Sequence, residues 1–180
     1  MRIQRAESVL LIIDIQTRLL PAIDQGDTVV DGARWLLGLA RDLDIPVRAT
    51  EHCPVALGTT TPVLRDALKP KELLEKTWFS AVAQGNLLPS VPAETRQWVV
   101  VGTEAHVCVQ QTVLDLLAAG QSVYVVADTV GSRRAADKQL ALNRMQQQGA
   151  SLVSREMVAF EWLERADTPE FRDVLRRYIR

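Results

Sequence analysis

The stretch Val9-Leu-Leu-Ile-Ile-Asp14 decides the fold class, because five consecutive apolar residues end abruptly in a carboxylate. An apolar run without polar alternation is typical of a parallel strand that is covered on both faces. The run is far shorter than the roughly 18 apolar residues that a membrane span needs. We therefore predict a buried strand over residues 9–13 that delivers Asp14 to the edge of a sheet.

The rest of the chain alternates apolar runs with amphipathic stretches. Further strands are predicted near residues 47–50 and at 98–102, 122–127 and 151–153, and helices at 28–43, 107–119, 135–148 and from Pro169 onward, with Thr168 as N-cap. Strands that alternate with helices form right-handed crossovers and a parallel sheet with helices on both faces. We expect one α/β domain over residues 1–180, a Rossmann-like three-layer sandwich.

The composition excludes several classes of partner. The 180 residues are 47% hydrophobic and 24% charged, with a formal net charge of −1. Such a balance offers no basic field for nucleic acid or an anionic membrane surface. The first residues do not form a signal-peptide pattern, so we expect a cytoplasmic protein that acts on a small molecule. No cofactor and no metal are expected.

Two cysteines, Cys53 and Cys108, are too few for a disulfide framework. Cys108 follows the predicted strand at residues 98–102 by one short turn and falls in the first turn of a helix. A helix start favours an anion, so we predict a lowered thiol pKa and a nucleophilic sulfur. The alternative is a small buried apolar side chain, which is the usual state of a free cysteine.

Asp14 and Cys108 are expected to meet, since ligand sites of open parallel sheets lie beyond the carboxyl ends of the strands. Asp14 then serves as general base for the thiol; the alternative is an aspartate in a turn. Gln16 either binds substrate or holds the loop. Lys76 lies between apolar and aromatic pairs, which favours a buried cation near Asp14 over the usual solvated lysine. Trp78 is predicted to line the pocket; the alternative is that Trp78 and Phe79 are ordinary core residues.

Two other clusters contain residue types that occur in binding sites. Glu51-His-Cys53 contains metal-ligand types, but adjacent residues of an extended segment point to opposite faces. Gly131-Ser-Arg-Arg134 resembles an anion-binding loop but lacks the glycine pattern of a phosphate cradle. Neither is predicted to be functional.

Three segments resemble the signatures of the isochorismatase-like hydrolases. They are Leu11-Ile-Ile-Asp-Ile-Gln16, Lys76-Thr-Trp-Phe-Ser80 and Val101-Gly-Thr-Glu-Ala-His-Val-Cys108. The continuation Ala127-Asp-Thr-Val-Gly-Ser-Arg133 is also similar, and the resemblance covers roughly residues 9–153.

The resemblance implies a catalytic triad of Asp14 as general base, Lys76 as electrostatic support and Cys108 as nucleophile. It also implies a cis peptide bond at Thr103–Glu104, amides of Glu104 and Cys108 as an oxyanion hole, and a homo-oligomer that is a dimer, tetramer or larger. The histidines of the metal-binding nicotinamidases have no match here, and retention of the thiol favours hydrolysis of an amide or related C–N bond. Isochorismate-type vinyl-ether cleavage and a catalytically silent interaction protein are the alternatives.

Overall fold

The computed structural model describes residues 1–179 and contains one sheet of six parallel strands. The strand order is β3-β2-β1-β4-β5-β6, and all neighbouring pairs run parallel. The strands are β1 (Ser8–Ile13), β2 (Val47–His52), β3 (Leu73–Lys76), β4 (Gln97–Thr103), β5 (Ser122–Gly131) and β6 (Ser151–Val153). The predicted parallel α/β sheet is confirmed.

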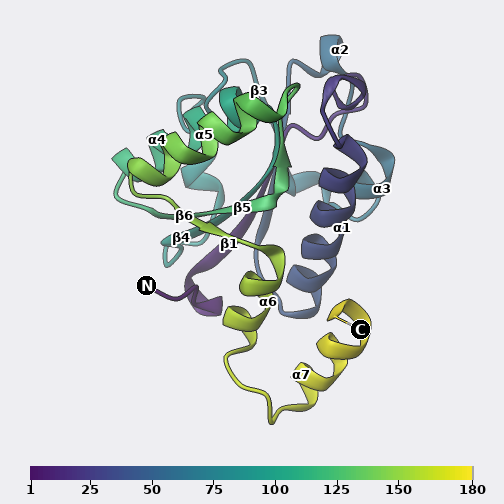
Figure 1. Ribbon diagram of the computed structural model, residues 1–180, viewed down its shortest axis with the longest axis vertical. Helices are drawn as coiled ribbons and strands as arrows, with labels where there is room; N and C mark the ends of the chain where they lie inside the picture. The colour runs from purple at the N-terminus through teal and green to yellow at the C-terminus, as the bar shows by residue number, and fades with distance from the viewer. Residues whose placement is uncertain (180) are drawn as a thin grey trace.

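Helices cover both faces of the sheet, with α4 and α5 on one side and α1 and α6 on the other (Figure 1). The helices are α1 (Gly26–Asp42), α2 (Pro54–Leu57), α3 (Pro62–Arg65), α4 (Gln110–Ala118), α5 (Ala135–Gln147), α6 (Arg155–Leu163) and α7 (Pro169–Val174). Thr168 caps α7, because its side chain accepts a hydrogen bond from the Phe171 amide at 3.0 Å.

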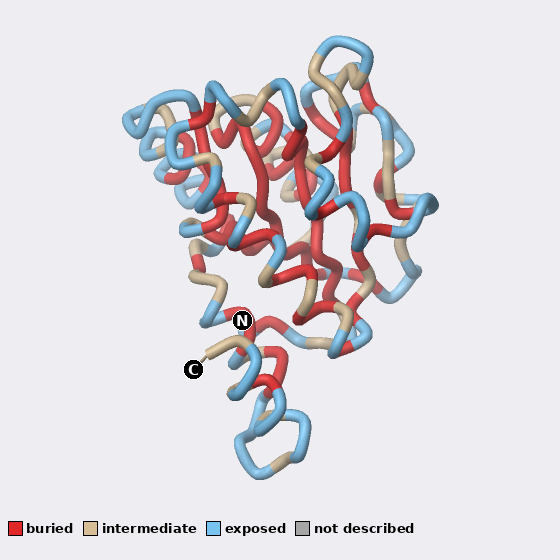
Figure 2. Tube along the Cα trace, turned by 90° about the vertical axis from the view of Figure 1, so that its right-hand side faces the viewer, coloured by how far each residue is buried: buried red, intermediate tan, exposed pale blue. Residues whose placement is uncertain are grey.

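The central strand β1 explains the layered core. Leu10 and Ile12 pack in the cluster beneath α1, whereas Leu11 and Ile13 pack in the cluster beneath α4 and α5. Alternate side chains of a strand point to opposite faces, so an unbroken apolar run supplies both cores at once. Figure 2 shows the result as a buried sheet between helices whose outer sides are exposed.

Four local features differ from the sequence prediction. Strand β3 and helix α6 were not predicted, and β5 continues to Gly131 instead of ending near residue 127. The helix predicted from residue 107 begins as a π-helical turn, Ala105–Val109, before α4 starts at Gln110. Cys108 therefore lies in a π-helical turn, a local geometry that often occurs at functional sites.

Strands β1 and β4 lie side by side where the strand order reverses, and Gly102 allows their close approach. Its φ is 138°, and a Cβ atom there would lie 2.2 Å from the Ile13 carbonyl oxygen. Only glycine fits such a position. Asp14 and the turn to Cys108 thus leave the sheet at neighbouring points of the same rim, where ligands of such folds bind.

Within residues 1–179, no helix is both long enough and apolar enough to cross a membrane.

Candidate active site

Asp14 directly follows β1 and is completely buried. Its backbone is left-handed, with φ 51°, a conformation that aspartate tolerates better than most residues. The Thr103 hydroxyl donates to the Asp14 carbonyl at 2.5 Å, and the Thr50 hydroxyl donates to carboxylate Oδ1 at 2.6 Å. Neighbouring strands therefore fix both the backbone and the side chain of Asp14.

Lys76 ends β3 and is also buried, with 2% of its surface exposed. Its Nζ lies 2.7 Å from Asp14 Oδ2 and donates to the Trp78 carbonyl at 3.3 Å. Because β2 separates β3 from β1, the lysine reaches past the end of β2 to form this pair. A buried ammonium without a partner is strongly disfavoured, so the Asp14 carboxylate compensates the charge of Lys76 and holds its side chain in place.

Cys108 lies beside this ion pair and is 4% exposed. Burial raises the pKa of its thiol, and the Asp14 carboxylate raises it further, whereas Lys76 acts in the opposite direction. The lowered thiol pKa predicted from the helix start is therefore wrong: desolvation and a neighbouring negative charge outweigh the short turn's dipole. The resting group is a neutral thiol next to a carboxylate that can accept its proton.

The turn between β4 and Cys108 differs from the prediction. The cis peptide bond expected at Thr103–Glu104 is wrong, because all peptide bonds of residues 1–179 are trans. The chain turns instead through Glu104, whose φ of 56° and ψ of 56° are left-handed. A non-glycine residue in this region costs on the order of 1–3 kcal/mol. The Glu104 carbonyl accepts from the Val107 and Val109 amides at 2.8 and 3.3 Å, which closes the π-helical turn.

A pocket of about 290 Å³ opens above these residues. It is lined by Asp14, Leu19, Ala22, His52, Leu57, Phe79, Glu104, Val107, Cys108 and Arg133. The lining combines apolar side chains with a few charged groups near the thiol, which is the usual composition of a small-molecule site.

Comparison with known proteins identifies the family of the chain. The isochorismatase domain family matches residues 8–157. The chain belongs to the isochorismatase family. It is 37% identical over 176 residues to isochorismatase domain-containing protein 2 of Danio rerio, covering 96% of this chain and 87% of the relative. Family membership classes the protein with hydrolases.

Solved structures share the fold over nearly the whole chain. MAR1 ribonuclease from Caenorhabditis elegans superposes with a TM-score of 0.91 at 33% identity, covering 100% of this chain and 93% of that one. The YcaC gene product of Escherichia coli, an octameric hydrolase of unknown specificity, gives 0.90 at 23% identity, covering 99% and 91%. At 23% identity, the similarity to the YcaC gene product shows a shared fold only.

Two residues expected to bind substrate lie elsewhere in this isochorismatase-family structure. Gln16 is fully buried; its amide donates to the carbonyls of His52 and Gly58 at 3.0 and 2.6 Å and accepts from the His52 amide at 2.8 Å. It holds the loop, the second role considered for it. Trp78 is 62% exposed and, of the pair Trp78-Phe79, only Phe79 is among the pocket-lining residues described.

His52 and Arg133 also line the pocket, although no sequence pattern indicated this. His52 was rejected with its neighbours as a metal cluster, and the three residues do separate: Glu51 turns away to pair with Arg65 at 2.6 Å. His52 lies against Phe79, with ring centroids 5.3 Å apart. Burial lowers the pKa of His52 and the charge of Lys76 lowers it further, so the imidazole is neutral near pH 7.

Proposed function

We propose that this protein is a cysteine-dependent hydrolase that cleaves a small amide, or a related C–N bond, through a thioester intermediate. The observation that carries the proposal is the meeting of three side chains, the Cys108 thiol, the Asp14 carboxylate and the Lys76 ammonium, beside one pocket. A nucleophile, a base within reach of it and a third group that orients the base are the parts that covalent acyl transfer requires.

In the first step Asp14 takes the thiol proton as the sulfur attacks the carbonyl carbon. A C–S bond forms, and the π electrons of the carbonyl move to its oxygen. We propose that this oxyanion is stabilised by the amides of Glu104 and Cys108, because N–H groups aimed at a developing negative charge lower the barrier. Lys76 holds Asp14 in place throughout.

In the second step the C–N bond breaks, and the amine leaves with the proton that Asp14 has stored. A thioester on Cys108 remains. Water then attacks this thioester, Asp14 takes a proton from the water, and the C–S bond breaks to release the acid. The proton returns to the sulfur, so Asp14 acts alternately as base and acid.

The raised pKa of the Cys108 thiol fits this sequence of events. A thiol that is neutral at rest does not lose its proton to bulk water but hands it to Asp14 when the substrate carbonyl arrives. Proton transfer and attack are therefore coupled, and the stored proton is available for the leaving amine. Free thiolate in the resting enzyme is not required.

The proposed substrate is a small molecule and not RNA, although one structural relative is a ribonuclease. The net charge of −1 supports this choice, because binding to a phosphate backbone depends on a basic surface. A homo-oligomer is also proposed; the E. coli relative is an octamer, and Trp78 remains exposed on the single chain beside the pocket residue Phe79.

The test is a panel of small amides, with intact-protein and peptide mass spectrometry to detect an acyl group. We expect acylation on Cys108, no acylation and no turnover for Cys108→Ala, and unchanged turnover for the matched control Cys53→Ala. Turnover of an isochorismate-type vinyl ether that survives in Cys108→Ala would favour vinyl-ether cleavage instead. If no amide or activated ester acylates Cys108, the thioester mechanism is wrong.

A further inference from the structure

The turn after β4 and the loop after β5 are joined beside the pocket by an ion pair. The Arg133 Nε lies 3.0 Å from Glu104 Oε1, and its Nη2 donates to Glu104 Oε2 at 3.2 Å. The sheet register brings the two segments together, because Thr103 is opposite Gly131 at the ends of β4 and β5. The Nη2 contact is the hydrogen bond of this pair, whereas Glu104 Oε1 is buried and accepts no hydrogen bond within residues 1–179, so its contact with Nε is electrostatic.

The two partners differ in burial. The Glu104 side chain is 9% exposed, whereas that of Arg133 is 57% exposed, and both residues line the pocket with Cys108. Burial of a carboxylate is costly unless a cation or hydrogen-bond donors lie against it. His106 is the other cationic type nearby, but its Nε2 is 4.0 Å from Glu104 Oε2 while its Nδ1 lies 3.0 Å from the Ser132 hydroxyl. Arg133 is therefore the main partner of Glu104.

Glu104 needs such a partner because its backbone is left-handed, which a residue with a side chain adopts only when its surroundings hold it there. Its carbonyl also closes the π-helical turn that carries Cys108. Without Arg133, movement of the Glu104 carboxylate toward water lowers its free energy, and that movement would relax the turn.

We propose that Arg133 is a positioning residue: by pairing with Glu104 it holds the left-handed turn in the conformation that aims the amides of this turn at the substrate oxygen. The inference rests on the proposed function. It goes beyond the three triad residues, because it makes the position of the oxyanion-binding amides depend on an ion pair between the turn after β4 and the loop after β5.

Two thiol reagents distinguish an effect on oxyanion binding by the turn from an effect on the reactivity of the Cys108 thiol. Acrylamide forms a C–S bond at its β-carbon while the C=C electrons shift to the carbonyl oxygen; Asp14 takes the thiol proton and returns it to the α-carbon. Iodoacetamide also forms a C–S bond, but the displaced electrons leave with iodide. Charge therefore develops on a carbonyl oxygen with acrylamide only, and the ratio of the two rates at Cys108 reports oxyanion binding without a known substrate.

The variants are Arg133→Gln and Arg133→Lys, with Arg134→Gln as matched control. Arg134 is the exposed residue before α5 and, within residues 1–179, has no ion pair. We expect Arg133→Gln to slow acrylamide labelling of Cys108 about ten-fold or more and to change iodoacetamide labelling less than about two-fold. Lysine should restore part of the acrylamide rate, and Arg134→Gln should leave both rates unchanged.

An equal loss of both rates, or no loss of either, overturns the positioning role. With a substrate in hand, Arg133→Gln should lower kcat; an increase in KM alone would mean that Arg133 only binds substrate and would also overturn the inference. Failure of the proposed function looks different, because it appears in the wild type as no acylation of Cys108 by any amide or activated ester. Thermal melting of each variant checks that it is folded.

Discussion

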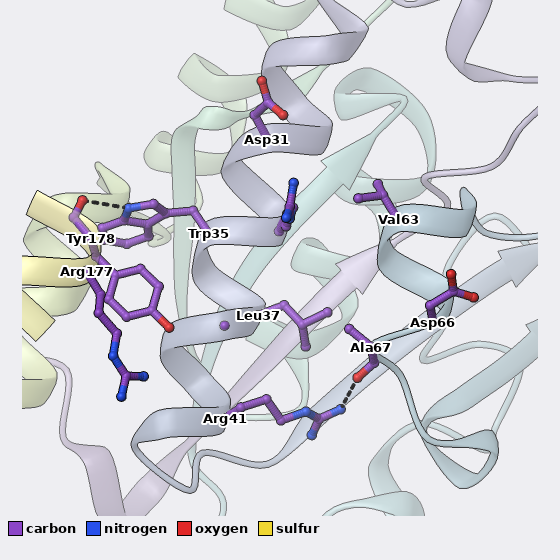
Figure 3. A pocket seen from close by; sticks show the side chains of 11 residues that line it. Asp31, Trp35, Leu37, Arg41, Val63, Asp66, Ala67, Arg177 and Tyr178 are labelled. Atoms are coloured by element: carbon purple, nitrogen blue, oxygen red, sulfur yellow. Dashed lines mark hydrogen bonds between the residues drawn. The ribbon is translucent and has the colours of Figure 1, made fainter. Parts of the chain in front are cut away.

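Two hollows in the molecule show how little size says about chemistry. The larger, of about 720 Å³, lies over α1 between α3 and the C-terminal segment (Figure 3). There the Trp35 indole donates to the Tyr178 carbonyl at 2.9 Å, and Arg41 donates to the Ala67 carbonyl at 3.0 Å. The smaller pocket, of about 290 Å³, contains Asp14 and Cys108.

The charged groups of the two hollows differ in solvent exposure. Beside the outer hollow, Arg177 pairs with Asp42 at 2.8 Å, with side chains 57% and 34% exposed. At the inner pocket, Lys76 pairs with Asp14 at 2.7 Å, with side chains 1% and 0% exposed. Water screens the first pair, whereas the second acts at nearly full strength on the neighbouring thiol. Burial of charge next to a nucleophile, and not volume, marks the reactive site.

The largest expected effect is a difference in kcat/KM between variants of the two paired aspartates, Asp14 and Asp42. Asp14→Asn removes the proposed base, so we expect kcat/KM on an amide substrate to fall about 10²- to 10⁴-fold. Asp42→Asn, the matched change at the outer hollow, should leave kcat/KM within about two-fold of wild type, as expected for a surface charge away from the chemistry. The kcat/KM values are measured by steady-state kinetics at a temperature where both variants are folded.

Similar activity losses in the two aspartate variants would contradict this distinction between the hollows. A full-rate Asp14→Asn enzyme would show that another group accepts the thiol proton.

The next effect concerns stability. Lys76→Met leaves the Asp14 charge buried without its cation, which costs about 3–5 kcal/mol, or roughly 6–20 °C in Tm for a chain of this size. Arg177→Met leaves Asp42 in water and should shift Tm far less. The double variant Asp14→Asn/Lys76→Met should regain part of the lost stability, because it contains no unpaired buried charge. Equal shifts for Lys76→Met and Arg177→Met in thermal melting would contradict the comparison.

The inner pocket was partly predictable from the sequence. Asp14 follows an unbroken apolar strand and Cys108 follows another, and parallel strands that end at one rim bring the two together. Lys76 was predicted as a buried cation from its apolar flanks, but the strand Leu73–Lys76 that positions it was not. Four residues carry too little periodicity to identify a strand, and only pairing with β2 defines it.

Properties that depend on three-dimensional surroundings were predicted poorly. The thiol pKa was expected to fall because the helix start was visible in the sequence, while the desolvation that raises it was not. Arg133 was not predicted to be functional, because its loop lacks phosphate-binding glycines. Its partner Glu104 lies 29 residues away along the chain, so no local sequence pattern indicates the ion pair. The role of Gln16 depended on which loop carbonyls its amide meets, and no local pattern encodes them.

The two cysteines should differ in their effect on stability at alkaline pH. Because the folded-state pKa of Cys108 is raised, the unfolded chain loses this proton first as pH rises above the ordinary thiol value of about 8.5. Unfolding is then favoured by up to about 1.4 kcal/mol per pH unit, so the stability present below pH 8 is lost progressively in alkali. We expect Cys108→Ser to flatten the fall of Tm between pH 8 and 10, and the control Cys53→Ser to leave it unchanged.

An identical alkaline slope in wild type and Cys108→Ser would mean that the Cys108 thiol titrates at its ordinary pKa. In that case the resting nucleophile is more acidic than its burial implies, and Asp14 has less need to act as its base.

The smallest expected effect lies at the outer hollow. The Tyr178 hydroxyl donates to Asp42 at 2.7 Å, and its ring meets Trp35 edge to face at 5.5 Å. Tyr178→Phe keeps the aromatic contact and removes one partly exposed hydrogen bond, so we expect a loss of about 0.5–1 kcal/mol and no change in kcat/KM. Burial and then the bond to Asp42 raise the pKa of Tyr178 to about 12, so the variant should also lose less stability than wild type above pH 10. If Tyr178→Phe lowers kcat/KM as strongly as Asp14→Asn does, the outer hollow is coupled to the inner pocket through α1, and the two regions are not independent.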